Sequence, residues 1–209
     1  MSMMDEVVNH LNSHEGCPFV LKGGFALARL HGLDRAVSEL GFDAPGGATS
    51  KRLFPERLGE LCVAAGYALQ IDEACGVQRA LLDCGTGVPL LRVEVLYRRA
   101  DIPDEAVELA DGVNVYRLGR LAELKAAAYS SRGDVHDLYD LAFICMRLLG
   151  RLGPNAVNAV RDALTYTDRG RVEYMLRAQA AVPVDAHRLR SMVPRAFAAL
   201  GLAYGDGDD

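Results

Sequence analysis

Hydrophobic and polar positions follow two different periods along the chain, and the change between them predicts two structural halves. In the first half, short apolar runs are typical of strands, most clearly over residues 90–97, where Arg92 and Glu94 interrupt the run at alternate positions. From Leu118 onward, apolar residues recur only at helical spacing. We therefore expect an α+β protein, in which a mixed sheet with flanking helices is followed by a C-terminal helical bundle.

The expected elements follow this division. The first half should contain helices over 3–13, 25–30 and 55–65, and strands over 19–21, 39–42, 67–71, 77–82, 90–97 and 113–116. The second half should contain helices over 121–131, 134–149, 155–166, 171–180 and 185–201. We expect an α/β domain over 1–117, a helical domain over 118–203 and a disordered acidic tail over 204–209.

Composition narrows the class of protein. No run of 18 apolar residues exists, so no membrane span is expected, and the acidic start of the chain lacks the pattern of a secretory signal. The five cysteines are odd in number, scattered and never in a CxxC spacing. We expect them to be reduced and mostly buried thiols that form neither a zinc site nor a disulfide frame. These features indicate a cytoplasmic protein.

Charge is distributed unevenly although the whole chain is acidic, with a net charge of −5. Residues 1–112 contain 10 lysines and arginines against 17 acidic residues, whereas residues 113–203 contain 13 against 8. A basic half can attract a polyanion such as RNA. The alternative is that these arginines only solvate helix faces.

The pair Gly23-Gly24 is the first candidate for chemistry. It follows a short apolar strand and opens a helix. Glycines at a helix start leave backbone N–H groups accessible, and these groups together with the helix dipole favour a phosphate. The alternative is an ordinary tight turn.

Carboxylates on two later strands are candidates for a metal site. Residues i and i+2 of a strand share a face, so an Asp-x-Asp pair would hold Mg2+, but the two positions here are Glu39 and Gly41. Asp43 lies about 13 Å from Glu39 along an extended strand, too far to share one ion unless the chain bends at Gly41 or Pro45. Glu94 could supply another carboxylate, unless it only pairs with Arg92 or a neighbour. We expect weak Mg2+ binding, which Gly41→Asp should tighten.

A lysine and two aspartates in the helical half form the third candidate. Only three lysines occur against twenty arginines, and Lys125 lies in an apolar helical segment, where a charge is costly unless it reaches solvent or is used. Asp137 and Asp140 are three residues apart and share a helix face. The alternative for Asp137 is a simple preference for the start of a helix.

Together these residues resemble the AbiEii/AbiGii-type nucleotidyltransferase toxins of the DNA polymerase β-like nucleotidyltransferase superfamily. The resemblance covers about residues 15–145. It rests on Leu21-Lys22-Gly23-Gly24, on Arg35, Leu40 and Phe42 in register, on Glu94 and Lys125, and on His136-Asp137-Leu138-Tyr139-Asp140-Leu141. The chain departs from the family pattern at Val37, Glu39, Gly41 and His136.

The resemblance implies a nucleotidyltransferase-like fold and transfer of a nucleotide from an NTP to an acceptor such as tRNA, with an antitoxin protein as partner. It also implies roles for single residues. Lys125, Asp140 and Glu39 would be catalytic, Lys22, Gly23, Gly24 and Asp137 would bind the nucleotide, and Glu39 and Glu94 would hold Mg2+. Gly23, Gly24, Glu39, Glu94 and Lys125 would then line one cleft.

Gly41, in place of the second carboxylate, also favours another interpretation. The chain would then be a catalytically inactive relative that acts as a nucleotide-binding or regulatory module. A third interpretation is a helical interaction domain whose motifs match by chance.

Overall fold

The structure is a computed structural model that describes residues 2–14, 16–85, 87, 89–179 and 181–205. The chain forms two compact units. Unit 1 comprises Met1–His31 and Val37–Arg117, and unit 2 comprises Gly32–Ala36 and Leu118–Asp209. Residues 32–36 fall within the α/β domain expected over 1–117, but their contacts group them with the helical unit.

Unit 1 contains a mixed sheet, as the sequence predicts, with seven strands rather than the six expected. The strands run in the order β3-β4-β5-β2-β1-β7-β6. Their bounds are β1 Val20–Lys22, β2 Glu39–Pro45, β3 Ala68–Ala74, β4 Val77–Asp83, β5 Leu91–Arg98, β6 Val107–Ala110 and β7 Val113–Tyr116. The helices of the unit are α1 Met3–Asn12, α2 Gly23–His31, α3 Ala48–Ala65 and the short 3-10 helix η1 Asp104–Ala106.

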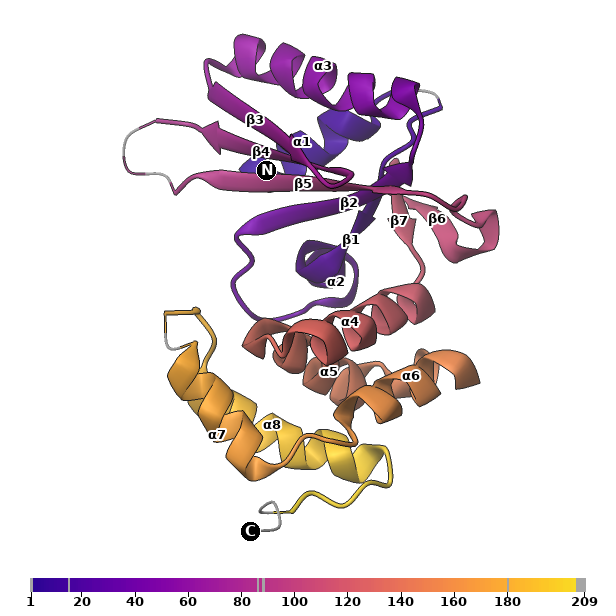
Figure 1. The fold of residues 1–209 in the computed structure, drawn as a ribbon, viewed down its shortest axis with the longest axis vertical. Helices are drawn as coiled ribbons and strands as arrows, with labels where there is room; N and C mark the ends of the chain where they lie inside the picture. The colour runs from indigo at the N-terminus through magenta and orange to yellow at the C-terminus, as the bar shows by residue number, and fades with distance from the viewer. Residues whose placement is uncertain (1, 15, 86, 88, 180, 206–209) are drawn as a thin grey trace. The chain divides into compact units, whose positions relative to one another are not determined.

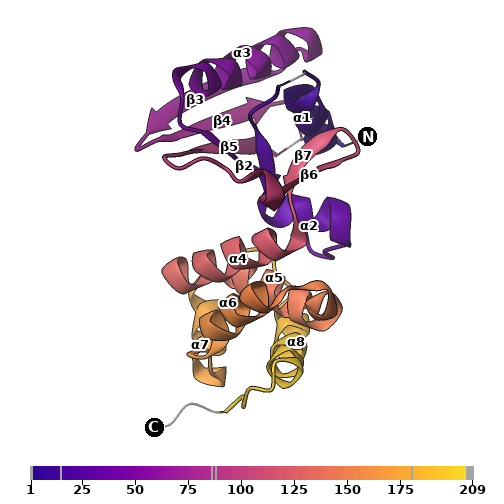
Figure 2. The same cartoon turned by 90° about the vertical axis from the view of Figure 1, so that its right-hand side faces the viewer.

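The two faces of this sheet differ in chemistry. Leu40 and Phe42 of β2, with Val93 and Val95 of β5, are fully buried on one face. Helices α1 and α3 cover that face, and α2 lies on the other (Figures 1 and 2). The alternation predicted for residues 90–97 is therefore confirmed. The face opposite carries Glu39, Gly41 and Asp43 of β2, which become the centre of the first candidate site.

Two elements of unit 1 show the largest differences from the expectation, whereas β2 and β3 only extend further than expected, to Pro45 and Ala74. Helix α3 begins at Ala48 rather than at Pro55, which lies inside it. The apolar spacing that predicted this helix begins only near Pro55, whereas the helix itself starts a further seven residues earlier and accommodates the proline in its interior. Strand β6 was missed, because four residues that follow a loop give too short a pattern for assignment.

The described part of unit 2 is helical apart from its loops, as predicted. Its helices are α4 Leu118–Arg132, α5 Val135–Arg147, α6 Pro154–Leu164, α7 Arg169–Ala178 and α8 Ala186–Ala199, with the 3-10 helix η2 Leu149–Arg151. Helix α4 packs against α5 and α6, and α8 packs against α5 (Figure 2). The α5 helix is the centre of this core, since ten of its residues are buried.

Several smaller expectations can be assessed directly. No helix among the described residues is long and apolar enough to cross a membrane. All five cysteines are free, but only Cys62 and Cys145 are buried, so the expectation of mostly buried thiols was too broad. Of the predicted tail, residues 206–209 lie outside the described residues. Tyr204 packs its ring at 5.0 Å from that of Phe197, so the ordered chain extends beyond the predicted start of the tail.

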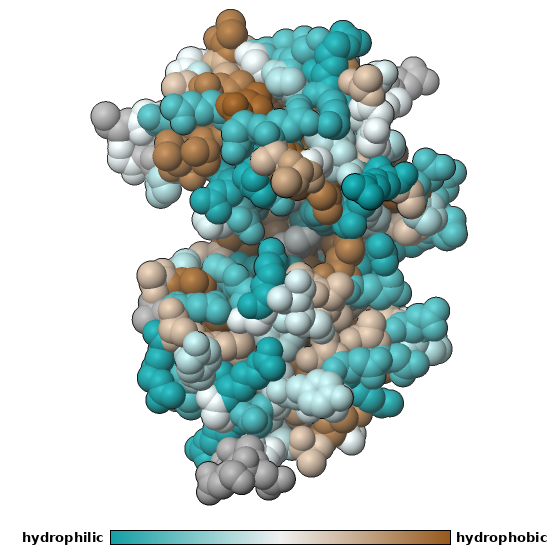
Figure 3. Space-filling view, viewed as in Figure 1, coloured by the Kyte–Doolittle hydropathy of each residue, from teal (hydrophilic) through white to brown (hydrophobic). Residues whose placement is uncertain are grey.

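Apolar side chains also reach the surface of unit 1. Figure 3 shows them gathered over α3, β3 and β4. Val63 of α3 is 86% exposed, and Ile71 of β3 is also exposed. Since β3 is an edge strand, this apolar surface continues to the edge of the sheet.

Candidate functional site

The turn between β1 and α2 has the geometry expected of a glycine pair. Gly23 adopts a φ of 81°, in the left-handed region that other residues rarely occupy, and it is the first residue of α2. A Cβ added at Gly23 would meet no atom within 4 Å, so the turn is open on that side. The prediction that Gly23 and Gly24 bind phosphate is compatible with this geometry and stays a prediction.

A row of four positions crosses the polar face of the sheet beside this turn. Lys22 of β1 is paired with Gly41 of β2, Gly41 with Glu94 of β5, and Glu94 with Arg79 of β4. Directly paired residues in neighbouring strands point to the same face. The row therefore reads cation, glycine, carboxylate, cation.

Asp43, two residues beyond Gly41, is the most enclosed charged residue of this face. It is 0% exposed. Lys22 Nζ donates to its Oδ1 at 2.5 Å, Arg98 Nε donates to its Oδ2 at 2.7 Å, and the Tyr116 hydroxyl donates to the same oxygen at 2.9 Å. The sequence offered Asp43 only as a metal ligand and did not indicate these partners. The position of Asp43 in a buried strand could have indicated that it has such partners, because a buried carboxylate requires hydrogen-bond donors.

Glu39 and Glu94, the predicted metal ligands, lie on the same face but are engaged differently. The Glu39 side chain is 68% exposed and lies 4.0 Å from Arg92. Glu94 accepts a hydrogen bond from Arg79 Nε at 2.9 Å. The alternative of a strand-face ion pair thus describes Glu94, with Arg79 as the neighbour.

These residues do not form a cage for a divalent metal. Among the described residues, no three acidic, histidine or cysteine side chains come together as metal ligands. Asp43 accepts hydrogen bonds from three side chains, two of them cationic, Glu94 is paired, and Gly41 contributes no oxygen. Since Mg2+ requires near-octahedral oxygen ligands, the donor set does not fit it.

Unit 2 contains a second charged group, which includes the predicted residues Lys125, Asp137 and Asp140. The Nζ of Lys125 on α4 lies 2.9 Å from Oδ1 of Asp137 and 2.6 Å from Oδ2 of Asp140, both on α5. The two carboxylates are buried, at 1% and 0% exposure. Lys125 is therefore not extended into solvent but bridges two carboxylates inside the unit.

Two arginines extend this group at either end. Arg35 makes a bidentate pair with Asp140, with Nε at 2.6 Å and Nη2 at 2.8 Å from the two carboxylate oxygens. Arg132 lies 2.7 Å from Asp137. The sequence of charges is Arg132, Asp137, Lys125, Asp140, Arg35, and we call these five residues the α4–α5 charge network. Sequence analysis placed Arg35 beside the acidic strand and did not expect its partner.

The network also explains why residues 32–36 belong to unit 2. Arg35 anchors this segment to α5, and Asp34 accepts a hydrogen bond from the hydroxyl of Tyr139 at 3.0 Å. Asp34 is also paired with Arg188 of α8. Bidentate and charge-assisted bonds are among the strongest polar contacts in proteins, so they fix this short segment firmly.

The surroundings favour the charged forms of two members of the network, Lys125 and Asp137. Burial opposes the ammonium of Lys125, but the charges of Asp140 and Asp137 outweigh it and raise its pKa. Burial opposes the carboxylate of Asp137 as well, and Lys125 and Arg132 reverse that effect and lower its pKa. His136 is different: burial and the nearby Arg35 lower its pKa, so the ring is neutral at pH 7. An ammonium at Lys125 is thus held over a wide pH range.

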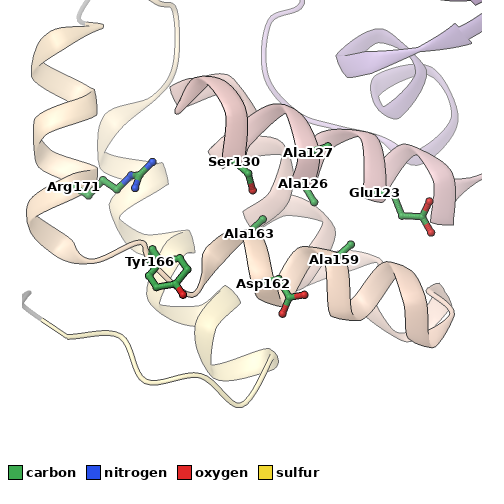
Figure 4. A pocket seen from close by; sticks show the side chains of 9 residues that line it. All are labelled: Glu123, Ala126, Ala127, Ser130, Ala159, Asp162, Ala163, Tyr166 and Arg171. Carbon is green, nitrogen blue, oxygen red and sulfur yellow. The ribbon is translucent and has the colours of Figure 1, made fainter. Parts of the chain in front are cut away.

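A groove of about 420 Å³ lies elsewhere in unit 2, between α4, α6 and α7 (Figure 4). Four alanines form much of its lining, with Tyr166 and Arg171 at one end and Glu123 at the other. None of the predicted site residues lines it. Its composition indicates helix packing around small side chains rather than a reaction site.

Comparison with solved structures identifies the fold. The chain is similar to JHP933 from Helicobacter pylori, with a TM-score of 0.69, 18% identity, and coverage of 94% of this chain and 88% of that one. It is similar to a second H. pylori protein that carries the provisional description nucleotidyltransferase, with a TM-score of 0.65, 20% identity and coverage of 95% and 93%. The chain has a nucleotidyltransferase-like fold. MenT4, a nucleotidyltransferase toxin from Mycobacterium tuberculosis H37Rv, is also similar, with a TM-score of 0.53, 20% identity and coverage of 95% and 81%.

No protein-family model matches the chain, and no curated protein shows significant sequence similarity to it. The nucleotidyltransferase-like fold is therefore preserved at identities of 18–20%. The roles predicted for single residues, and the single cleft predicted to contain Gly24 and Lys125, stay predictions.

Proposed function

We propose that this chain is a nucleotidyltransferase-like toxin, similar to the AbiEii type, which binds an NTP and transfers a nucleotide to an acceptor such as tRNA. The main support for this proposal is the structural similarity to MenT4, a nucleotidyltransferase toxin. The similarity covers 95% of this chain and 81% of MenT4. Because both the sheet and the helices are included, the similarity extends beyond a shared sheet. A cognate antitoxin protein is the expected partner.

Each unit contributes groups suited to this chemistry. In unit 1, the amides of Gly23 and Gly24 at the start of α2 would bind phosphate oxygens, with Lys22 beside them. In unit 2, Lys125 is held as an ammonium by Asp137 and Asp140 and would offset negative charge that develops on the transferred phosphoryl group. Attack by an acceptor hydroxyl on the α-phosphate would release pyrophosphate.

A second candidate is a catalytically inactive nucleotide-binding or regulatory module with the same fold. The specific observation that favours it is the polar face of unit 1, where Gly41 replaces a carboxylate and Glu39 is 68% exposed. Such a protein would bind a nucleotide without transferring it.

Incubation of the purified protein with each labelled NTP and total RNA separates the two candidates. An active enzyme should label an RNA band, and Lys125→Met should abolish the labelling. Lys51→Met is the matched control, because Lys51 pairs with Glu73 at 2.5 Å outside the charge network. Thermal unfolding of both variants shows whether they are folded. Nucleotide binding without any labelling would instead support the inactive module.

The predicted RNA substrate has its own test. The basic balance of residues 113–203 supports it, and binding to phosphates releases counterions, so affinity should fall steeply as salt rises. A filter-binding titration with tRNA at low and moderate salt measures this. Failure to bind tRNA even at low salt would argue against RNA as the acceptor.

A further inference from the structure

The side chain of Lys22 lies over Gly41, where the fold would place the second carboxylate of a metal site. A Cβ added at Gly41 would lie 3.5 Å from both Cγ and Cε of Lys22. This is ordinary van der Waals contact, so the lysine stem already covers the position. The missing side chain at Gly41 therefore leaves no empty space, because the Lys22 side chain of the neighbouring strand lies over it.

The ammonium at the end of this stem is directed to a fixed partner. Its Nζ lies 2.5 Å from Asp43, which is fully buried and also pairs with Arg98 at 2.6 Å. Two cations thus face one carboxylate, and this cluster carries a net positive charge. A divalent cation brought to the same place would meet the positive charges of Lys22 and Arg98 at short range and would be repelled by them.

We propose that Lys22 is the resident cation of this sheet face, so that unit 1 excludes a divalent metal there and binds nucleotide phosphate without one. An ammonium carries three N–H groups, of which one donates to Asp43. The Lys22 side chain is 18% exposed, which leaves it accessible to a phosphate oxygen. The nucleotide half of this inference rests on the proposed function, whereas the exclusion of metal does not.

The same geometry revises the expected effect of restoring a carboxylate. An aspartate introduced by Gly41→Asp would stand between Lys22 and Glu94 in the row across the sheet. The stem of Lys22 is the nearest group to it, so the new carboxylate would form an ion pair with the ammonium. Gly41→Asp alone should therefore not create a metal site, and removal of the lysine is needed as well.

Binding of Mn2+, followed by the electron paramagnetic resonance signal of the free ion, tests the exclusion of metal. The wild-type protein and Glu94→Gln should bind Mn2+ equally weakly, and Gly41→Asp should bind no more tightly. The double variant Lys22→Met with Gly41→Asp should bind at least about tenfold more tightly, since charge and ligand number set the affinity of such sites. Lys22→Arg with Gly41→Asp is the matched control, and it should stay weak because the cation is retained.

Three results would overturn the proposal. One is wild-type Mn2+ binding that Glu94→Gln abolishes, since a metal would then already use this face. Another is Gly41→Asp binding Mn2+ as tightly as the double variant. The third is a folded double variant that binds no more tightly than wild type. If Lys22→Met prevents folding, Mn2+ binding by the wild type, Glu94→Gln and Gly41→Asp still shows whether this sheet face excludes the metal.

Equilibrium dialysis with ATP, in EDTA or in Mg2+, tests the nucleotide half. Affinity in EDTA should be at least as high as in Mg2+, since free ATP carries more negative charge than its Mg2+ complex, and Lys22→Met should weaken it about tenfold, as loss of a charged hydrogen bond does. Lys51→Met should leave it unchanged. A loss of affinity in EDTA would overturn the proposal. Absence of ATP binding in both buffers would refute the proposed function and this half, while the Mn2+ experiment would still decide the other.

Discussion

Two buried aspartates in different units, Asp43 and Asp140, are held in the same way but have different surroundings. Each is 0% exposed, and each pairs with one lysine and one arginine. Around Asp140 a second carboxylate, Asp137, continues the chain of alternating charges. Around Asp43 the third donor is a neutral hydroxyl, that of Tyr116.

The difference shows what each lysine can do. Lys125 bridges two carboxylates and is 12% exposed, so its charge is held within a network that ties α4 to α5. Lys22 has one carboxylate partner and lies over a glycine, so its charge is less fully offset. The α4–α5 charge network therefore mainly stabilises the packing of α4 against α5. The cluster around Asp43 mainly places a positive charge on the sheet face.

The largest expected effect comes from breaking the charge network at Asp140. Asp140→Asn keeps the shape but removes the charge that faces Lys125 and Arg35, and loss of one partner of a buried pair costs about 3–5 kcal/mol of unfolding free energy. Urea denaturation measures this. Glu173→Gln, which removes the carboxylate facing Arg190 on the surface, is the control and should change stability little. Equal effects of the two variants would show that the network does not stabilise unit 2.

A smaller loss is expected at Asp43, because two donors remain when one is removed. Lys22→Met should lower the unfolding free energy by about 1–3 kcal/mol, the cost of an unsatisfied charged partner. Lys22→Arg should recover most of it, since a cation is restored. If Lys22→Met were more destabilising than Asp140→Asn in the same urea titration, the contrast between the two aspartates would be wrong.

Local elements could be predicted because their signals are local. The alternation in β5 and the Gly23 turn are set by neighbouring residues, and the sequence placed both correctly. The partners of Asp43 could not be predicted, because Arg98 and Tyr116 are brought to it by strand pairing across long sequence separations. Likewise, Arg35 and Asp140 are 105 residues apart, and no periodicity links them.

Dependence on pH offers a finer test of the charge network. The pKa of Asp137 is lowered below 3.8, so its contribution to stability is present above that pH and is lost as pH falls through the folded-state pKa. The pKa of Lys125 is raised above 10.5, so its contribution is present below that pH and is lost as pH rises through the folded-state pKa. Stability should therefore fall at both extremes.

The free energy of unfolding, measured from pH 7 into the alkaline range, shows the contribution of Lys125. In Lys125→Met the alkaline decrease should be smaller than in wild type, because the titrating ammonium is gone. Lys51→Met should keep the wild-type decrease, since Lys51 is not part of the network. An unchanged alkaline decrease in Lys125→Met would mean that other groups cause it.

The smallest expected effect compares Asp43 with another aspartate of unit 2, Asp34. Each accepts a hydrogen bond from one tyrosine hydroxyl. Tyr116→Phe removes the bond to Asp43 at 2.9 Å, and Tyr139→Phe removes the bond to Asp34 at 3.0 Å. Asp43 is fully buried, so its oxygen cannot recover the bond from water, and Tyr116→Phe should cost about 1–2 kcal/mol. The side chain of Asp34 is 33% exposed, and water can replace the lost donor there. Tyr139→Phe should therefore lower the unfolding free energy less in the same urea titration. The reverse order would show that Asp34 depends more on its tyrosine hydroxyl than Asp43 does.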